Sequence, residues 1–475
     1  VIEYHKDKIP NKETITDALW HAWHCTPSKQ NYYPYSVNIL GPGKEFDDEK
    51  LKVWDKAMIN HHDVEIRAHE KKQLKETKFK VNRTYQHLSD APYVIVFTSR
   101  TVDPEKTNDW NKKCIAEDGH FSEPEFSDQH ETLAQATSIE VGLFAANLPE
   151  KYGGGGLDYS SMMVVEREYG KTSHALHSWI ARPTEILLAC NEKQMEEYLY
   201  PCVKGDKREL FALTEPDAGS DIMSMKSNAK KEGTDWILNG SKHFISGPCM
   251  PDFAIVFAAT GEDETPRGKR KRITAFLVDV GIPGFDIQEG TKCISYRGYK
   301  NYQLSFNDVR LSADKILGTE GNGLSLSGKW LGMGRIWVGA TCCGKAERIL
   351  DLALDWAAQR KQFGKPIGTF QATGFKLADM KMNLRAADLL VKDAVDRALS
   401  GQMMDEDAAI VKIFCSEMLN KVADDTVQIF GGMGLMEEMP IERLWRDSRL
   451  ERIWDGTSEI QRHIVTRSML RPLGA

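Results

Sequence analysis

The spacing of hydrophobic and polar positions changes along the 475-residue chain, and each pattern predicts different elements. In residues 1–148, YSVNIL and APYVIVFTSR are short runs of β-branched and aromatic residues, which predicts buried strands. Residues 130–148, HETLAQATSIEVGLFAANL, are rich in alanine and leucine and predict a helix. The charge-dense EIRAHEKKQLKETKFK fits a solvated helix face or a loop. This part is therefore predicted to be mixed α/β.

A break in regular structure is predicted after residue 148. Pro149 and the glycine run of residues 153–156 disfavour any regular element. A phosphate-binding P-loop is the alternative, but the Lys-Ser/Thr pair that it requires does not follow. Between residues 209 and 312 the runs WILNGSKHFISG, FAIVFAATG, ITAFLVDV and YQLSFNDVRL alternate with Gly, Pro and Asp turns. That alternation predicts a β-domain.

From residue 313 onward the hydrophobic period becomes helical. Ile349, Leu352, Ala353 and Trp356 follow i, i+3, i+4, i+7 spacing. The next helix continues the same pattern, at Leu377, Met380, Leu384, Ala387 and Val391. Such long helices with short connections predict an antiparallel bundle over residues 313–475. The predicted fold is multidomain α+β.

Composition excludes several classes of function. The 41% of hydrophobic and 28% of charged residues fit a soluble globular chain, and no apolar run approaches the ~18 residues of a membrane span. The net charge of −7 disfavours nucleic acid as a partner. The polar start predicts no secretion signal, and the cysteine pattern indicates free thiols in a reducing compartment, for which the cytoplasm is the default. Apart from Cys342-Cys343 the nine cysteines are scattered, so neither a metal site nor a disulfide framework is predicted.

Four separated segments resemble the signature segments of acyl-CoA dehydrogenases, in the same order and spacing. They are LFALTEPDAGSD (210–221), RKQFGKPIGTFQ (360–371), QIFGGMGLMEEMPIERLWRD (428–447) and WDGTSEIQR (454–462). The resemblance covers residues 149–475. It implies a helical remnant of the family's N-terminal domain at 149–208, a β-barrel-like middle domain at 209–312 and the helical bundle at 313–475.

The resemblance also implies an FAD site. Leu213, through its backbone, and Thr214 would bond the flavin ring, and Ser220 would meet the acyl-CoA chain. Phe244 would lie beside the flavin and Ser246 would face flavin N5, where a hydroxyl stabilises arriving hydride density. On their own, LTEPDAGSD fits a polar turn and HFIS a half-buried strand.

A second group of FAD contacts is implied further along. Arg360 would clamp the FAD pyrophosphate of a neighbouring subunit, because a guanidinium suits phosphate oxygens. Gln362, Phe363 and Gln371 would lie along the adenosine end, and Gln428, Gly431 and Gly432 would let the backbone approach the cofactor. A Rossmann reading of GGMGLM fails, because a predicted helix and not a strand precedes it.

Asp455 stands where the family carries a glutamate, the base that removes the proton α to the thioester. The alternative is a helix N-cap, which Asp before Gly-Thr-Ser-Glu would suit. As the base, Asp455 would take the α-proton while the β-hydrogen leaves as a hydride to flavin N5, and the product would be an enoyl-CoA. Its backbone N–H would bind the thioester oxygen, and burial would raise the pKa of its carboxyl group.

The residues around Asp455 have implied roles too. Thr457 would contact FAD, whereas Gly456 and Arg335 would contact substrate, although Arg335 could instead pair with a buried acid. Aspartate is shorter than glutamate by ~1.5 Å. Because a misplacement of about 1 Å can cost ~100-fold in rate, the backbone or the substrate must shift, or activity is weak. A branched, cyclic or polar acyl group whose position is shifted would explain the shorter side chain. Activity as an enoyl-CoA reductase is another explanation.

The N-terminal part resembles another flavoprotein family, the nitroreductases, which bind FMN. The resemblance rests on WHCTPSKQNYYPYSVNIL (23–40), APYVIVFTSR (91–100) and SIEVGLFAANL (138–148), and it implies that Ser28 and Asn31 contact FMN. An ordinary Pro-Ser turn is the alternative for CTPSKQN.

Three functions remain open at this point. The first is an FAD-dependent acyl-CoA dehydrogenase of fatty acid metabolism, a homotetramer or homodimer that passes electrons to an electron-transfer flavoprotein. The second is an FMN-dependent nitro or quinone reductase. The third is a non-catalytic protein that binds flavin or CoA thioesters.

Overall fold

The computed structural model describes residues 35–40, 94–99, 144–172, 174, 177–178, 183–266 and 268–473. The chain divides into two compact units, residues 1–136 and 137–475. Ser28 and Asn31, the expected FMN contacts, lie outside the described residues.

The described part of the first unit is one antiparallel strand pair. Strand β1 (Tyr35–Leu40) pairs with β2 (Val94–Ser99) in continuous register, from Tyr35 opposite Ser99 to Leu40 opposite Val94. Both strands were predicted from their β-branched runs, and both predictions are confirmed.

The helix predicted over residues 130–148 is wrong where the structure describes it. Phe144–Asn147 form a turn, with Ala145 at a φ of 54°. The carbonyl of Ala145 accepts from Gly155 N at 3.0 Å, and that of Ala146 accepts from Leu157 N at 2.8 Å. The glycine run therefore folds back and takes the carbonyls that a helix would use.

A short helical region follows. Its elements are the 3-10 helix η5 (Glu150–Tyr152), α6 (Tyr159–Tyr169), the 3-10 helix η6 (Glu185–Ala189), α8 (Glu192–Gln194), the π-helical η7 (Met195–Leu199) and α9 (Tyr200–Lys204). Asp158 caps α6 by accepting from Ser161 N at 2.8 Å, and Asn191 and Gln194 form a capping box for α8. These local signals explain where the helices begin.

An eight-stranded sheet follows. Its strands are β3 (Glu209–Ala212), β4 (Asn228–Glu232), β5 (Asp235–Gly247), β6 (Phe253–Thr265), β7 (Gly268–Asp279), β8 (Phe285–Glu289), β9 (Lys300–Leu311) and β10 (Ile316–Leu317). The order is β10-β7-β6-β4-β5-β9-β8, and β3 pairs in parallel with β6. All four strands predicted here are confirmed. The expected barrel-like closure is not seen, because β10 and β8 end the strand order.

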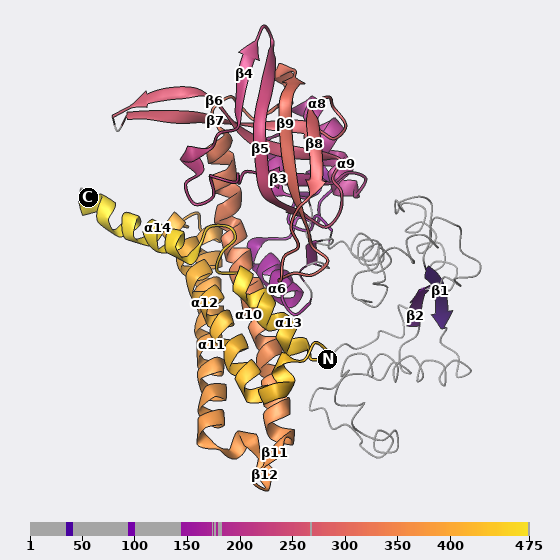
Figure 1. Cartoon of the computed structure of the whole chain (residues 1–475), viewed down its shortest axis with the longest axis vertical. Coiled ribbons are helices and arrows are strands. Elements are labelled where there is room, and N and C mark those ends of the chain that lie inside the picture. The colour runs from indigo at the N-terminus through magenta and orange to yellow at the C-terminus, as the bar shows by residue number, and fades with distance from the viewer. Residues whose placement is uncertain are drawn as a thin grey trace. The chain divides into compact units, whose positions relative to one another are not determined.

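The sheet curls on itself, and the first half of β6 is buried on both faces. Along β6, Phe253, Ile255 and Phe257 belong to one hydrophobic cluster, which also contains the short helices. Ala254 and Val256 belong to a second cluster, together with residues of β5 and β9. The β5–β9 half of the sheet therefore packs against its β6–β7 half. Figure 1 shows β6 and β7 continuing beyond the other strands as a long hairpin.

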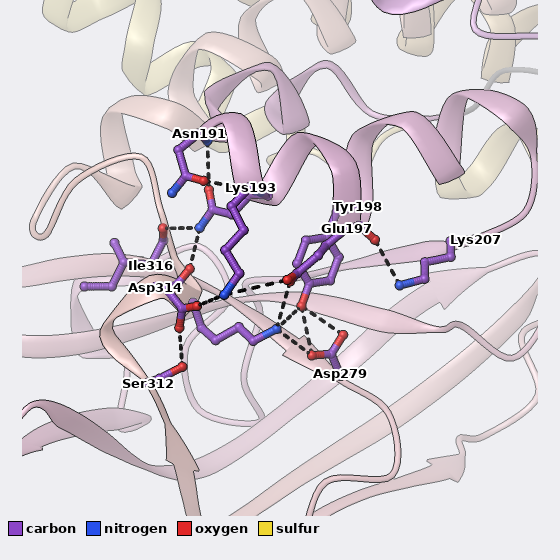
Figure 2. A network of polar contacts seen from close by, with 11 residues as sticks. Asn191, Lys193, Glu197, Tyr198, Lys207, Asp279, Ser312, Asp314 and Ile316 are labelled. Carbon is purple, nitrogen blue, oxygen red and sulfur yellow. Dashed lines mark hydrogen bonds and ion pairs between the residues drawn. The ribbon is translucent and has the colours of Figure 1, made fainter.

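A polar network fastens the short helices to the sheet (Figure 2). The buried Gln194 donates to the carbonyls of Asp314 at 2.8 Å and Ile316 at 2.7 Å. The Tyr198 hydroxyl lies 2.8 Å from Asp279 Oδ2, and Lys315 Nζ lies 2.9 Å from the same oxygen. The network satisfies polar groups that would otherwise be buried without partners.

Long helices form the remainder of the chain (Figure 1). They are α10 (Gly323–Gln359), α11 (Gln371–Leu399), α12 (Asp405–Phe430), α13 (Pro440–Leu450) and α14 (Ser458–Leu470). Short pieces connect them: the hairpin β11 (Lys361–Gln362) and β12 (Lys365–Pro366), and the 3-10 helices η10 (Ile367–Thr369) and η11 (Gly431–Leu435). The 3-10 helices η8 (Ile222–Ser224), η9 (Ala313–Lys315) and η12 (Arg471–Leu473) complete the chain.

Helices α10, α11 and α12 alternate in direction. Gly339 of α10 packs against Val411 of α12, and further along both helices Trp356 stacks on Phe430 with ring centroids 4.7 Å apart. Contacts that advance together on both helices mean that α10 and α12 are parallel, with α11 antiparallel to each. No helix in the described part of the chain is both long enough and apolar enough to cross a bilayer.

Candidate active site

Asp455 lies in the turn between α13 and α14, just before the helix and not at its cap. Thr457 is the N-cap, because its side chain accepts from Ile460 N at 3.3 Å and α14 begins at Ser458. Asp455 has a φ of 51° and Gly456 a φ of 93°. A positive φ costs a non-glycine residue energy, so the surrounding contacts must impose this conformation on Asp455. The N-cap interpretation of Asp455 is therefore wrong.

Three side chains from three helices hold the carbonyl groups of this turn. Arg335 Nε of α10 and Gln461 Nε2 of α14 each donate to the Asp455 carbonyl at 3.1 Å. Lys412 Nζ of α12 donates to the Gly456 carbonyl at 2.8 Å, and Gln461 adds a bond of 3.0 Å to the same oxygen. Gln461 and Lys412 are both 0% exposed. The peptide groups around Asp455 are thus fixed from several sides.

The carboxylate of Asp455 is left free. Neither of its oxygens accepts a hydrogen bond from a described residue, and its backbone N–H likewise has no acceptor in the described part of the chain. Burial raises the pKa of the Asp455 carboxyl above its ordinary value, although Lys412 and Arg335 pull that pKa down. A carboxylate with these properties is available as a proton acceptor.

Arg335 makes a backbone contact instead of a pair with a buried acid. Its guanidinium bonds the Asp455 carbonyl, and no ion pair joins it to a described carboxylate. Burial lowers the pKa of Arg335. Arg335 thus lies beside Asp455.

Behind the turn lies a buried polar cluster built around Glu451, which is 0% exposed. Its Oε2 accepts from Trp454 Nε1 at 2.8 Å, and its Oε1 accepts from Lys345 Nζ at 2.5 Å. The Tyr296 hydroxyl also donates to Oε1 and accepts from Lys345 at 2.9 Å. The carboxylate is therefore fully bonded and its charge is matched by a lysine, as a buried ion pair requires.

A second buried ion pair shapes the loop after β3. Lys242 Nζ, from β5, lies 2.8 Å from Glu215 Oε1 and 3.0 Å from the Leu213 carbonyl, and neither side chain is more than 4% exposed. His243 N donates to the Thr214 carbonyl at 2.9 Å. Burial lowers the pKa of Lys242 to about 8, against the opposing effect of Glu215. Leu213 and Thr214 are thus held against β5.

The predicted flavin residues of β5 lie on an irregular strand. Pairing with β9 shifts register between Lys242 and Ile245, and Phe244 within this bulge has a φ of 56°. Its ring is 61% exposed, which is unusual for phenylalanine and gives a flat apolar surface for a ligand. Ser246 is half-buried nearby on the same strand, and Ser220 is exposed on the loop after β3.

The remaining predicted FAD residues lie at the other end of α10. Arg360 ends that helix, and along its axis it is separated from Arg335 by roughly 37 Å, at ~1.5 Å per residue. All seven residues of this group are exposed: Arg360, Gln362, Phe363, Gln371, Gln428, Gly431 and Gly432. The structure therefore separates them from Asp455 and does not join them into one site.

This distant group fits a phosphate-bearing cofactor. Arg360 has no ion-pair partner among the described residues, so its guanidinium is available. A Cβ added at Gly431 or Gly432 would meet no atom within 4 Å, so a ligand has open access to that backbone. Phe363 adds a ring that is 93% exposed.

Several supporting residues were not predicted. Glu215, Lys242 and Gln461 stand inside or beside the quoted motifs, but a polar residue in a motif gives no sign of burial. Lys345 and Lys412 do carry a signal, because each interrupts an apolar helical stripe, in TCCGKAERIL and AAIVKIFCSEM. A lysine on a buried helix face requires a specific partner.

Three family models match this chain. They are the acyl-CoA dehydrogenase N-terminal domain over residues 112–206, the middle domain over 210–309 and the C-terminal domain over 321–470. The first begins within the segment that resembles nitroreductases, and that resemblance gains no support.

Curated relatives agree with the family models. The chain is 37% identical over 334 residues to an acyl-CoA dehydrogenase of Bacillus subtilis, which covers 69% of this chain and 87% of the relative. It is 36% identical over 335 residues to 3-(aryl)acrylate reductase of Clostridium sporogenes, covering 70% and 88%. It is 34% identical over 337 residues to the caffeyl-CoA reductase-Etf complex subunit CarC of Acetobacterium woodii, again covering 70% and 88%.

Solved structures share the fold. Butyryl-CoA dehydrogenase from Megasphaera elsdenii superposes with a TM-score of 0.66 at 34% identity, over 79% of this chain and 100% of that one. An acyl-CoA dehydrogenase from Bacillus anthracis, complexed with FAD, gives a TM-score of 0.67 at 28% identity, over 78% and 70%.

Proposed function

Because this chain belongs to the acyl-CoA dehydrogenase family, we propose that it is an FAD-dependent oxidoreductase that converts an acyl-CoA thioester to the enoyl-CoA. The observation that carries the proposal is the Asp455 turn, whose carbonyls are bonded from three helices while its carboxylate and N–H are left free. That arrangement suits a base that acts next to a developing enolate.

Asp455 would remove the proton α to the thioester. Its raised pKa increases its basicity towards a weak carbon acid, and the absence of carboxylate hydrogen bonds lets the side chain turn towards the substrate. The Asp455 N–H would donate to the thioester oxygen as negative charge gathers there. Arg335 and Gly456 would line the substrate side of the same turn.

FAD, when bound, supplies the acceptor for the hydride that leaves the β-carbon. Leu213, Thr214, Phe244, Ser246 and Thr457 would hold the flavin end. The Lys242–Glu215 pair would support Leu213 and Thr214 by fixing their backbone. The exposed ring of Phe244 offers an apolar face, and Ser220 would contact the acyl-CoA chain.

A second copy of the chain would complete the FAD site. Arg360 is separated from Arg335, which contacts the Asp455 turn, by roughly 37 Å along α10. Arg360 and the exposed residues around it therefore lie too far away to bind the same flavin end within one chain. They would instead bind the pyrophosphate and adenosine of a neighbour's FAD. A homodimer or homotetramer is the assembly that this requires.

The electrons would leave to an electron-transfer flavoprotein. A relative named as part of a reductase-Etf complex supports such a partner. None of the cysteines that the structure describes forms a disulfide, which fits a reducing compartment such as the cytoplasm. FMN chemistry through the N-terminal segment is not favoured.

The test combines flavin identification with an acyl-CoA panel. Purified protein should release FAD on denaturation, and saturated acyl-CoAs of varied chain length and branching, including 3-arylpropionyl-CoA, should bleach its visible flavin absorbance. Because two named relatives are reductases, the reduced enzyme should also be offered enoyl-CoAs. Bleaching by no member of the panel, with FAD fully loaded, would refute the proposal.

The variant Asp455→Asn tests whether Asp455 is the catalytic base. Asp455→Asn retains the size of the side chain and its free position but cannot accept the proton. We expect it to bind FAD normally and to lose bleaching. Bleaching at an unchanged rate would exclude Asp455 as the base and would favour another carboxylate.

A further inference from the structure

The indole of Trp454 connects the Asp455 turn to the buried cluster behind it. Trp454 directly precedes Asp455 in the chain, and its Nε1 donates to Glu451 Oε2 at 2.8 Å. Glu451 is 0% exposed and Lys345 is 3% exposed, so the acceptor is itself immobilised. A bond to a buried, charged acceptor is stronger than a neutral one.

The cluster is tied to two elements outside the turn. Lys345 belongs to α10, and Tyr296 belongs to the loop between β8 and β9. The Tyr296 backbone N–H also donates to Asp447 Oδ1 of α13 at 2.6 Å. The cluster that holds the Glu451 acceptor therefore contains residues of both the helical and the β parts of the unit.

The turn needs stabilising contacts because its backbone conformation is unfavourable. The φ of Asp455 is 51°, and the contacts of Arg335, Lys412 and Gln461 all go to the carbonyl groups of Asp455 and Gly456. Those contacts fix the carbonyl groups. The Trp454 bond adds a contact at the residue before Asp455, which those carbonyl contacts do not reach.

We propose that the Trp454–Glu451 hydrogen bond is a positioning contact, which places the Asp455 turn so that a side chain one methylene shorter than glutamate reaches the α-carbon. This inference rests on the proposed function of Asp455 as the base. Trp454 would act through the position of Asp455 and not by contact with the reacting atoms.

Trp454→Phe is the appropriate variant, because it removes the donor and retains an aromatic ring. We expect kcat to fall by about 10- to 100-fold, as for a base displaced by a fraction of an ångström to 1 Å, with KM changed less than about twofold. Glu451→Gln is less suitable, because it removes the carboxylate that pairs with the buried Lys345 ammonium and should strongly destabilise the fold.

A double-mutant cycle separates positioning from a general structural effect. Asp455→Glu lengthens the base, so its reach should no longer depend on the exact position of the turn. In that background Trp454→Phe should cost less than about threefold in kcat. An equal loss in both backgrounds, or an effect confined to KM, would overturn the proposal. Trp236→Phe, a buried ring in β5 that packs against Phe276, is the matched control.

Hydrogen exchange provides a readout that needs neither FAD nor substrate. In Trp454→Phe, a peptide spanning residues 450–458 should exchange at least about tenfold faster, whereas peptides of β6 should not change. Unchanged exchange at the turn would overturn the positioning role. If the unsubstituted protein has no acyl-CoA activity but the turn still loosens, then the proposed function fails and the contact stands.

Discussion

Gly456→Ala is expected to destabilise the protein by about 2–4 kcal/mol, through two separable effects. The first is conformational: Gly456 has a φ of 93°, and a left-handed conformation costs an L-residue about 1–2 kcal/mol. The second is steric, because an added Cβ would lie 2.5 Å from Gln461 Nε2.

The steric effect has a definite size. Gln461 is 0% exposed, so its amide cannot move into solvent, and it donates to the carbonyls of both Asp455 and Gly456. Displacing it weakens two hydrogen bonds worth about 1 kcal/mol each. The other nearby groups, Arg335 and Ile460, lie at 3.5 and 3.6 Å and would tolerate the new methyl group.

Gly281→Ala is a control for the conformational effect alone. Its φ is 89°, and an added Cβ would meet no atom within 4 Å. Urea denaturation should show a loss of about 1–2 kcal/mol for Gly281→Ala. Gly456→Ala should lose about 1–2 kcal/mol more, and its turnover should fall about 100-fold if the turn moves by 1 Å. Equal destabilisation of the two variants would refute the contact argument.

Three further predictions follow from the charged and polar side chains described above. Asp455→Asn should raise Tm at pH 7–8: because the folded pKa of Asp455 lies above its unfolded value, its charge is destabilising above that pKa, and the gain should disappear as the pH falls towards 4. A Tm gain that is the same at pH 4 and pH 8 would contradict this sign. Lys242→Met should cost about 3–5 kcal/mol in urea denaturation and reduce FAD content, whereas Lys226→Met, which breaks an ion pair more than 60% exposed, should cost under about 1 kcal/mol. Tyr198→Phe should cost about 1–2 kcal/mol, since it removes the bond to Asp279, and unchanged denaturation would show that the network in Figure 2 does not stabilise the fold.

The elements with strong periodicity could be predicted from the sequence, because burial itself imposes the pattern. The helical stripe of α11 is buried at Met380, Leu384, Ala387 and Val391, and β6 is apolar because both faces of the sheet are covered. The turn at residues 144–147 could not be predicted. Its alanine-rich composition favours a helix, but bonds from Gly155 and Leu157 decide its conformation.

The sequence suggested candidate-site residues within one motif or through the family resemblance, but not the contacts that hold them. Asp455, Gly456 and Thr457 form one motif, and Arg335 was found through the resemblance. The contact between Lys412 and the Gly456 carbonyl joins positions 44 residues apart, and that between Lys345 and Glu451 joins positions 106 apart. Such pairings depend on how α10, α12 and the turn pack, and hydrophobic spacing carries no information about them.

Burial also protects the lysines of this site from chemical modification. Thioesters of coenzyme A transfer acyl groups to accessible amines, and lysine is the usual target of acylation. Lys242, Lys345 and Lys412 are 1%, 3% and 0% exposed, so a reactive thioester cannot approach them in the folded protein. Lys193 and Lys226, with side chains 64% and 73% exposed, are open to such damage. Exposed to acyl-CoA thioesters, the protein would thus accumulate adducts on its surface lysines, while the buried amines that hold the candidate site would stay unmodified.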